Sequence, residues 1–163
     1  MRLGLDANCF IDRFNPASPN HDAAALLFEA GDDERVTLLV SRHTLTELGV
    51  RRDEALELAE SLPVLRHWPI GTWGEQVAAW NQLEGTWADA ARHQGLQQRL
   101  KALAKTGTDI RDRGAALDAL LNGVDGFVTS DGALADPKPA ARIREATGLR
   151  VLTPRAAVEG LGV

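Results

Sequence analysis

Short apolar runs and longer amphipathic stretches alternate along this chain. Four runs are short, almost wholly apolar and rich in residues that favour strands, which is typical of strands covered on both faces. They cover residues 3–6, 35–41, 125–129 and 150–152, and the apolar pair 64–65 indicates one more brief strand. The first run ends on Asp6, and the third leads into Ser130-Asp131-Gly132. The pattern therefore predicts buried strands, two of which lead directly to an acidic residue.

Between these runs, apolar residues recur at helical spacing. Residues 20–30 start at Asn20, a residue type that caps helices, and end before Gly31-Asp32-Asp33. Residues 108–121 start at the capping residue Thr108 and stop at Asn122-Gly123. Further helices are expected over residues 8–14, 44–50, 53–61 and 140–146, and Pro154 opens a last one.

Strands separated by helices are typical of one architecture. Parallel neighbours need crossover connections, so the alternation predicts an α/β fold, a three-layer α/β/α sandwich with a mainly parallel sheet. The length of 163 residues fits a single domain, residues 1–163. In such folds the carboxyl ends of the strands form the site.

The segment 72–105 is helical in composition and matches no motif. It carries Trp73, Trp80 and Trp87 at seven-residue spacing, which places them on one helix face. Packing between helices is the favoured explanation, self-association into a homodimer comes second, and a platform for stacking bases is a further alternative. This helical insert could cover a cleft, mediate dimerisation or recognise a partner.

Composition narrows the class of protein. With 44% hydrophobic residues but only short apolar runs and no signal-peptide pattern, the chain is expected to be soluble and cytoplasmic, with no membrane segment. The single cysteine, Cys9, excludes an intramolecular disulfide and a cysteine-based zinc site, and is expected to be a small buried residue. The net charge of −5 argues weakly against a protein that coats long nucleic acid.

Four acidic residues are expected to meet at one edge of the sheet. Asp6 and Asp131 follow strands, Glu47 lies just beyond the strand ending at Ser41, and Asp112 lies near the start of a helix. Carboxylates that lie close together raise one another's pKa values, and divalent cations relieve this repulsion. Oxygen donors with few histidines suit Mg²⁺ or Mn²⁺, which favours phosphodiester hydrolysis.

Each acidic residue also has an ordinary structural explanation. Asp6 could cap the turn after its strand, Glu47 could be a solvated helix charge, and Asp112 could favour a helix N-terminus. Asp131, followed by Gly132, could serve a turn or a helix cap. Taken singly, each explanation is the better one, but none of them accounts for the whole set.

The order of these motifs resembles the PIN-domain nucleases, a family that includes toxins of bacterial toxin-antitoxin pairs. Leu5-Asp6-Ala7-Asn8-Cys9-Phe10-Ile11-Asp12 is similar to the family's opening strand. Residues 41–48 are similar to its second motif, and the stretch from Asp112 to Val128-Thr129-Ser130-Asp131 is similar to its acidic helix and following strand end. The matches span nearly the whole chain.

The resemblance implies a PIN-like fold and metal-dependent cleavage of RNA. It carries over Asp6, Glu47, Asp112 and Asp131 as metal ligands, Thr129 as a supporting hydroxyl, and Asn8 as a residue that orients either Asp6 or a metal-bound water. Ala7 departs from the hydroxyl residue common after the first aspartate. Asp109 competes with Asp112 from the same helix face, and Asp118 is a fifth candidate.

Competing functions remain open. The leading hypothesis is an endoribonuclease, with His43 left out of the site. Arg42, Arg111 and Arg113 are candidate phosphate contacts, and solvated surface charge is an equally good explanation for them. Its more specific version is a toxin whose antitoxin protein blocks the acidic cleft. The alternatives are a catalytically silent protein- or RNA-binding module and a phosphatase acting on a small ester. The phosphatase is disfavoured because the second aspartate of many aspartyl-phosphate enzymes is missing after Asp6.

Overall fold

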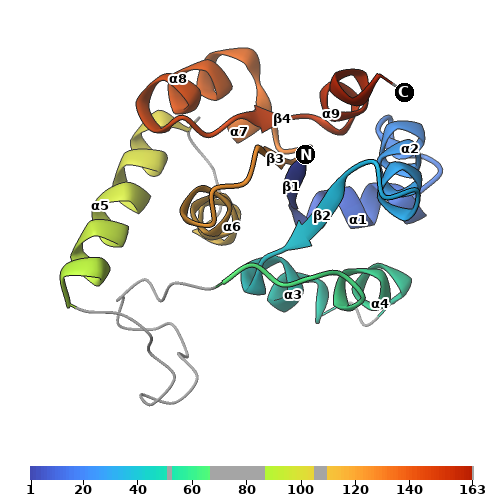
Figure 1. The fold of residues 1–163 in the computed structure, drawn as a ribbon, viewed down its shortest axis with the longest axis horizontal. Coiled ribbons are helices and arrows are strands. Elements are labelled where there is room, and N and C mark those ends of the chain that lie inside the picture. Colours follow the sequence, from blue (N-terminus) through green and yellow to red (C-terminus); the bar gives the residue numbers. More distant parts are fainter. Residues whose placement is uncertain (51–52, 67–86, 105–109, 163) are drawn as a thin grey trace.

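A four-stranded sheet with helices around it makes up the computed structural model, which describes residues 1–50, 53–66, 87–104 and 110–162 (Figure 1). Of residues 87–93, 97 and 110–112 it describes the helical backbone alone. The strands are β1 (Arg2–Leu5), β2 (Thr37–Val40), β3 (Gly126–Val128) and β4 (Val151–Leu152). The helices are α1 (Ala7–Phe14), α2 (His21–Asp32), α3 (Arg42–Leu48), α4 (Glu54–Glu60), α5 (Trp87–Leu103), α6 (Ile110–Leu121), α7 (Gly132–Ala135), α8 (Pro137–Thr147) and α9 (Pro154–Leu161).

The sheet is parallel throughout, in the order β2-β1-β3-β4. Leu5, the last residue of β1, pairs with Val40 at the end of β2 and with Val128 at the end of β3. The carboxyl ends of these strands therefore meet at one edge of the sheet. The parallel sheet and its four strands confirm the expected α/β class. The expected strand at 64–65 is reduced to one isolated bridge between Val64 and Val40.

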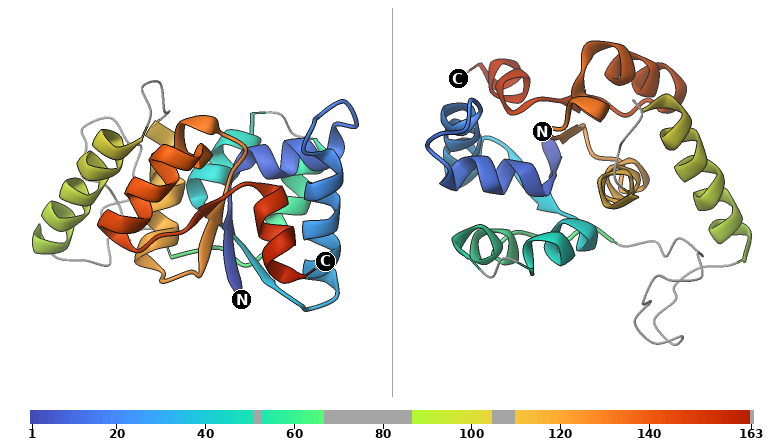
Figure 2. Two further views of the ribbon diagram at one scale, coloured as in Figure 1. Left: turned by 90° about the horizontal axis from the view of Figure 1, so that it is seen from above. Right: turned by 180° about the vertical axis from the view of Figure 1, so that it is seen from behind.

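Helices cover both faces of the sheet, because successive strand residues point to opposite faces. Leu38 and Val40 of β2 belong to one buried cluster, with side chains of α1, α2, α4 and α9, whereas Leu39 belongs to a second cluster, with side chains of α5, α6, α7 and α8. The two views of Figure 2 show these two groups of helices on opposite sides of the sheet. This arrangement is compatible with the predicted three-layer sandwich.

Most predicted helices are present, with differences at their ends. The predicted helix 44–50 begins earlier, at Arg42, because the Ser41 side chain caps it by accepting from the amide of Thr44. Asn20 stands at the start of α2 as predicted, but its side chain makes no cap hydrogen bond. The short helix α7 was not predicted. Thr108 lies outside the described residues.

The insert is described only in part. Trp73 and Trp80 lie outside the described residues, and Trp87 begins α5 without a described side chain. Leu100 of α5 is fully buried in the cluster that also holds residues of α6 and α8. Arg142 of α8 also donates to the Ala102 carbonyl at 3.2 Å. The described part of the insert therefore packs on the domain.

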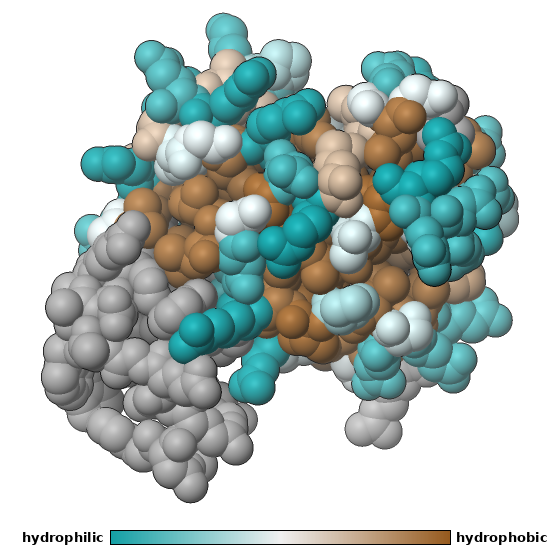
Figure 3. Space-filling view, in the orientation of Figure 1, coloured by the Kyte–Doolittle hydropathy of each residue, from teal (hydrophilic) through white to brown (hydrophobic). Residues whose placement is uncertain are grey.

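In the view of Figure 3 the periphery of the molecule is largely hydrophilic, and hydrophobic residues gather towards the middle. No helix in the described part of the chain combines the length and apolarity needed to cross a membrane.

Candidate functional site: a buried carboxylate at the strand ends

Asp6 directly follows β1 and is buried at the strand ends, with 1% of its surface exposed. The hydroxyl of Thr129, itself fully buried, donates to Asp6 Oδ2 at 2.6 Å, and Asn8 Nδ2 donates to the same oxygen at 3.2 Å. The backbone amide of Asp6 donates to the Val128 carbonyl at 3.0 Å, which ties the start of α1 to the end of β3. Asp6, which the sequence pattern indicated, therefore lies together with Asn8 and Thr129, which the family resemblance implied.

Burial raises the pKa of Asp6 from 3.8 to about 6. Desolvation is the largest cause, because a carboxylate loses its hydration in the protein interior. The hydrogen bond from Thr129 lowers the pKa, and the charge of Glu47 raises it again. The Asp6 carboxyl group therefore gains or loses its proton near pH 6, closer to neutrality than an unperturbed aspartate does.

Glu47 lies in α3 and is half-buried. The start of α3 is fixed to β1, since the Thr44 hydroxyl donates to the Leu5 carbonyl at 3.1 Å and the Thr44 amide donates to Ser41 Oγ at 3.1 Å. These bonds hold α3 beside the residue that precedes Asp6. Because the charge of Glu47 acts on Asp6, the structure brings these two predicted acids into one electrostatic environment.

Asp131 follows β3 and stands two residues beyond Thr129. Its amide donates to Thr129 Oγ1 at 3.0 Å, and its Oδ1 accepts from the Ala133 amide at 2.8 Å as the cap of α7. The helix-cap role that sequence reasoning weighed for Asp131 is therefore present. It occupies one carboxylate oxygen and leaves Asp131 connected to Asp6 through the Thr129 hydroxyl.

Asp112 lies in α6, and its side chain is outside what the structure describes, as is that of Arg111. Asp109 lies outside the described residues. Asp118 of α6 is buried, with 1% of its surface exposed.

Helix α6 packs against α3, and a Cβ atom added to Gly114 would stand 2.6 Å from His43 Nε2. The His43 ring therefore packs on the backbone of α6.

The described residues contain no cluster of three or more histidines, cysteines or acidic residues that could hold a metal ion. Of the four carboxylates expected to converge, Asp6 is acted on by the charge of Glu47 and is connected to Asp131 through the Thr129 hydroxyl. Arg42 is exposed at the start of α3, and Arg113 is half-buried. Cys9 is buried as expected, and its thiol donates to the Val128 carbonyl at 3.3 Å.

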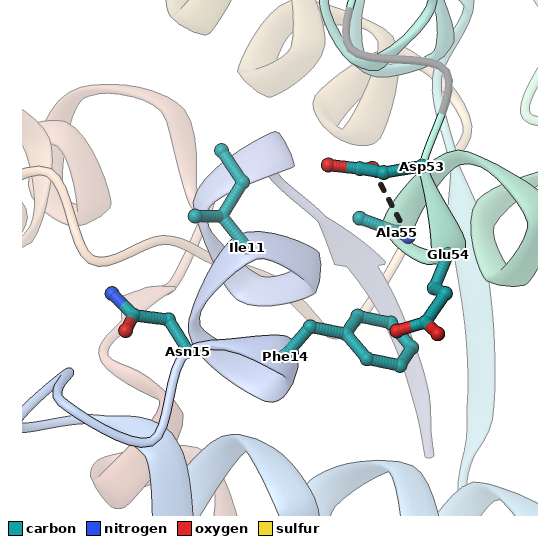
Figure 4. A pocket seen from close by; sticks show the side chains of 6 residues that line it. All are labelled: Ile11, Phe14, Asn15, Asp53, Glu54 and Ala55. Carbon is teal, nitrogen blue, oxygen red and sulfur yellow. Dashed lines mark hydrogen bonds between the residues drawn. The ribbon is translucent and has the colours of Figure 1, made fainter.

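A hollow of about 190 Å³ lies elsewhere, between α1 and the start of α4 (Figure 4). It is lined by Ile11, Phe14, Asn15, Asp53, Glu54 and Ala55. None of the predicted site residues lines it. Asp53 accepts from the Ala55 amide at 3.2 Å, which is an ordinary helix cap.

Sequence reasoning missed one further group next to the site. The carboxylate of Asp12 accepts from the hydroxyls of Ser18 and Ser130, at 2.6 and 2.5 Å. The Asp12 and Ser130 positions are 118 residues apart, so no local pattern could have paired them. The cap at Ser41 did carry a local signal, a serine immediately before a helical stretch.

Comparison with known proteins gave no matching family model and no matching curated relative.

Proposed function

We propose that this chain is a PIN-like, Mg²⁺- or Mn²⁺-dependent endoribonuclease. The observation that carries the proposal is the buried carboxylate of Asp6 at the carboxyl end of a central parallel strand. It is hydrogen-bonded by Thr129 and acted on by the charge of Glu47. Sites of open α/β sheets form at this edge. The resemblance of the surrounding motifs to the PIN family supplies the reaction class.

The donors at this edge suit a hard divalent cation. A carboxylate whose pKa is raised to about 6 by burial and by a second acid is stabilised in its charged form by a nearby cation. The nearest thiol, Cys9, has a pKa raised well above its ordinary value by burial and donates to a carbonyl, so it is a poor ligand. Oxygen donors without thiolate or imidazole favour Mg²⁺ or Mn²⁺ over Zn²⁺.

Each residue then has a role. Asp6, Glu47, Asp131 and Asp112 would hold the cation, and Thr129 and Asn8 orient the Asp6 carboxylate by donating to Oδ2. When bound, the cation supplies acidification of a water molecule and neutralisation of charge on a phosphodiester. Arg42, exposed at the start of the helix that carries Glu47, is the proposed phosphate contact.

RNA is the proposed substrate and an antitoxin protein the proposed partner, both from the family resemblance. A partner that blocks this edge would need a basic side chain to match the carboxylates.

Cleavage of defined single-stranded and structured RNAs with Mg²⁺ or Mn²⁺ tests the proposal. We expect turnover by the wild type, and loss of turnover in Asp6→Asn and in EDTA. Asp32→Asn makes the same chemical change at an exposed position, the last residue of α2, and should leave turnover unchanged. Equal activity in Asp6→Asn and Asp32→Asn would refute the assignment of the site.

A catalytically silent binding module is the second candidate. It is favoured by the helix cap at Asp131, whose Oδ1 accepts from the Ala133 amide and so already has a structural role. Mn²⁺ binding that depends on Asp6, without turnover of any RNA, would select this function.

A further inference from the structure

Asp12 joins three segments that are separate in the sequence. It lies in α1 and is half-buried. One carboxylate oxygen accepts from Ser18 Oγ in the connection between α1 and α2, and the other accepts from Ser130 Oγ just beyond β3. The Asp12 carbonyl also meets His21 Nδ1 at 3.0 Å at the start of α2.

Ser130 stands between two residues of the candidate site. Its predecessor, Thr129, donates to Asp6 Oδ2, and its successor, Asp131, donates its amide to Thr129 Oγ1. A hydrogen bond that fixes the Ser130 side chain therefore restrains the backbone on both sides of it. Asp12 supplies that bond.

Helix α1 meets the end of β3 at more than this point. The Cys9 thiol and the Asp6 amide both donate to the Val128 carbonyl, at 3.3 and 3.0 Å. Cys9 and Asp12 are three residues apart and share one face of α1. This face thus contacts Val128 and Ser130, on either side of Thr129, and Ser130 donates to a carboxylate oxygen of Asp12.

We propose that Asp12 is a positioning residue for the candidate site, which holds segment 129–131 against α1 so that Thr129 reaches Asp6. The inference rests on the proposed function for its consequence, cation binding, but its structural part stands on the hydrogen bonds alone. Partners that orient metal ligands typically change metal affinity by about 10–100-fold when they are removed.

Ser130→Ala and Ser18→Ala form a matched pair. Each removes one hydroxyl donor to the same carboxylate, but only Ser130 adjoins the site. We expect Ser130→Ala and Asp12→Ala to weaken Mn²⁺ binding about tenfold, measured by calorimetry, and Ser18→Ala to leave it within about twofold. Asp12→Asn, which keeps one acceptor oxygen, should recover part of the affinity. Adding Ser130→Ala to Asp12→Ala should weaken binding no further.

Amide hydrogen exchange supplies a second measurement, which needs neither metal nor RNA. The Asp131 amide is bonded to Thr129 Oγ1, so its exchange should quicken in Ser130→Ala and Asp12→Ala and stay slow in Ser18→Ala. The Ala156 amide, bonded to Thr153 Oγ1 at the start of α9, is the internal control for folding.

Equal effects of Ser18→Ala and Ser130→Ala on Asp131 exchange would overturn the positioning role. Failure of the wild type to bind Mn²⁺, with the exchange difference present, would instead count against the proposed metal site and leave the positioning role supported.

Discussion

Thr129 Oγ1 lies 2.6 Å from Asp6 Oδ2, and the two residues are 123 positions apart in the chain. The same hydroxyl oxygen accepts from the Asp131 amide at 3.0 Å. One side chain at the end of β3 thus sets the environment of the carboxylate at the end of β1 and connects it to the next acidic residue.

Thr129→Val should raise the pH at which the protein begins to bind Mn²⁺. The Thr129 hydrogen bond lowers the pKa of Asp6, so its removal lifts that pKa above about 6 and keeps the carboxyl protonated to higher pH. Thr129→Ser retains the donor and should behave like the wild type. Mn²⁺ titrations at a series of pH values measure the midpoint, and coincident midpoints for the Val and Ser variants would contradict the prediction.

Asp6→Asn should remove a pH dependence of stability from the metal-free protein. Asp6 has a folded pKa of about 6 against 3.8 for an unperturbed group, so between these values the folded chain keeps a proton that the unfolded chain releases. The free energy of unfolding therefore falls as pH rises through this window, by roughly 3 kcal/mol in all. In EDTA at pH 7.5, Asp6→Asn should consequently be more stable than the wild type.

Urea unfolding in EDTA between pH 3.5 and 7.5 tests this difference. Added Mn²⁺ should then stabilise the wild type at pH 7.5 and leave Asp6→Asn unchanged, because a ligand that binds only the folded state shifts the equilibrium towards it. Parallel stability curves for the two proteins across the pH range would show that burial does not perturb Asp6.

Ser41→Ala should cost stability and also weaken cation binding. Ser41 caps α3, the helix that carries Glu47, and contacts Thr44, which holds this helix to Leu5. Loss of a helix cap costs about 1 kcal/mol. Thr153→Ala removes the equivalent cap of α9 and is the matched control. Both variants should lose similar stability in thermal unfolding, but only Ser41→Ala should lose Mn²⁺ affinity. Equal Mn²⁺ affinities of the two variants would show that α3 does not contribute to the cation site.

Gly114→Ala should destabilise the contact between α3 and α6. The added Cβ would stand 2.6 Å from His43 Nε2, so the imidazole has to move, at a cost of about 1–3 kcal/mol. Gly95→Ala, at an exposed position within α5 with open space around it, should instead stabilise by about 0.5–1 kcal/mol. Denaturant unfolding measures both changes.

A double variant separates the collision from other causes. His43→Ala removes the ring that the new methyl group meets, so Gly114→Ala should cost little in that background. If Gly114→Ala destabilised the His43→Ala protein as much as the wild type, the His43 ring would not be the source of the destabilisation.

The elements of the fold were largely set by local pattern. A strand formed by an apolar run such as residues 35–41 has apolar side chains on both faces, which only a sheet covered on both sides can bury. The helices between successive strands provide the crossover connections that a parallel sheet needs. Because parallel strands end at the same edge, the position of Asp6 and Asp131 after two such runs was enough to predict that they meet. Both residues follow neighbouring strands, β1 and β3.

Tertiary structure decided what each of these side chains does. The bond from Thr129 to Asp6 and the bond from Ser130 to Asp12 each join residues more than 100 positions apart, and hydrophobic packing of α1 on the sheet brings them together. The raised pKa of Asp6 likewise depends on burial by distant segments. The sequence by itself determined which residues end the strands; the chemistry of those residues was decided by contacts that local pattern does not encode.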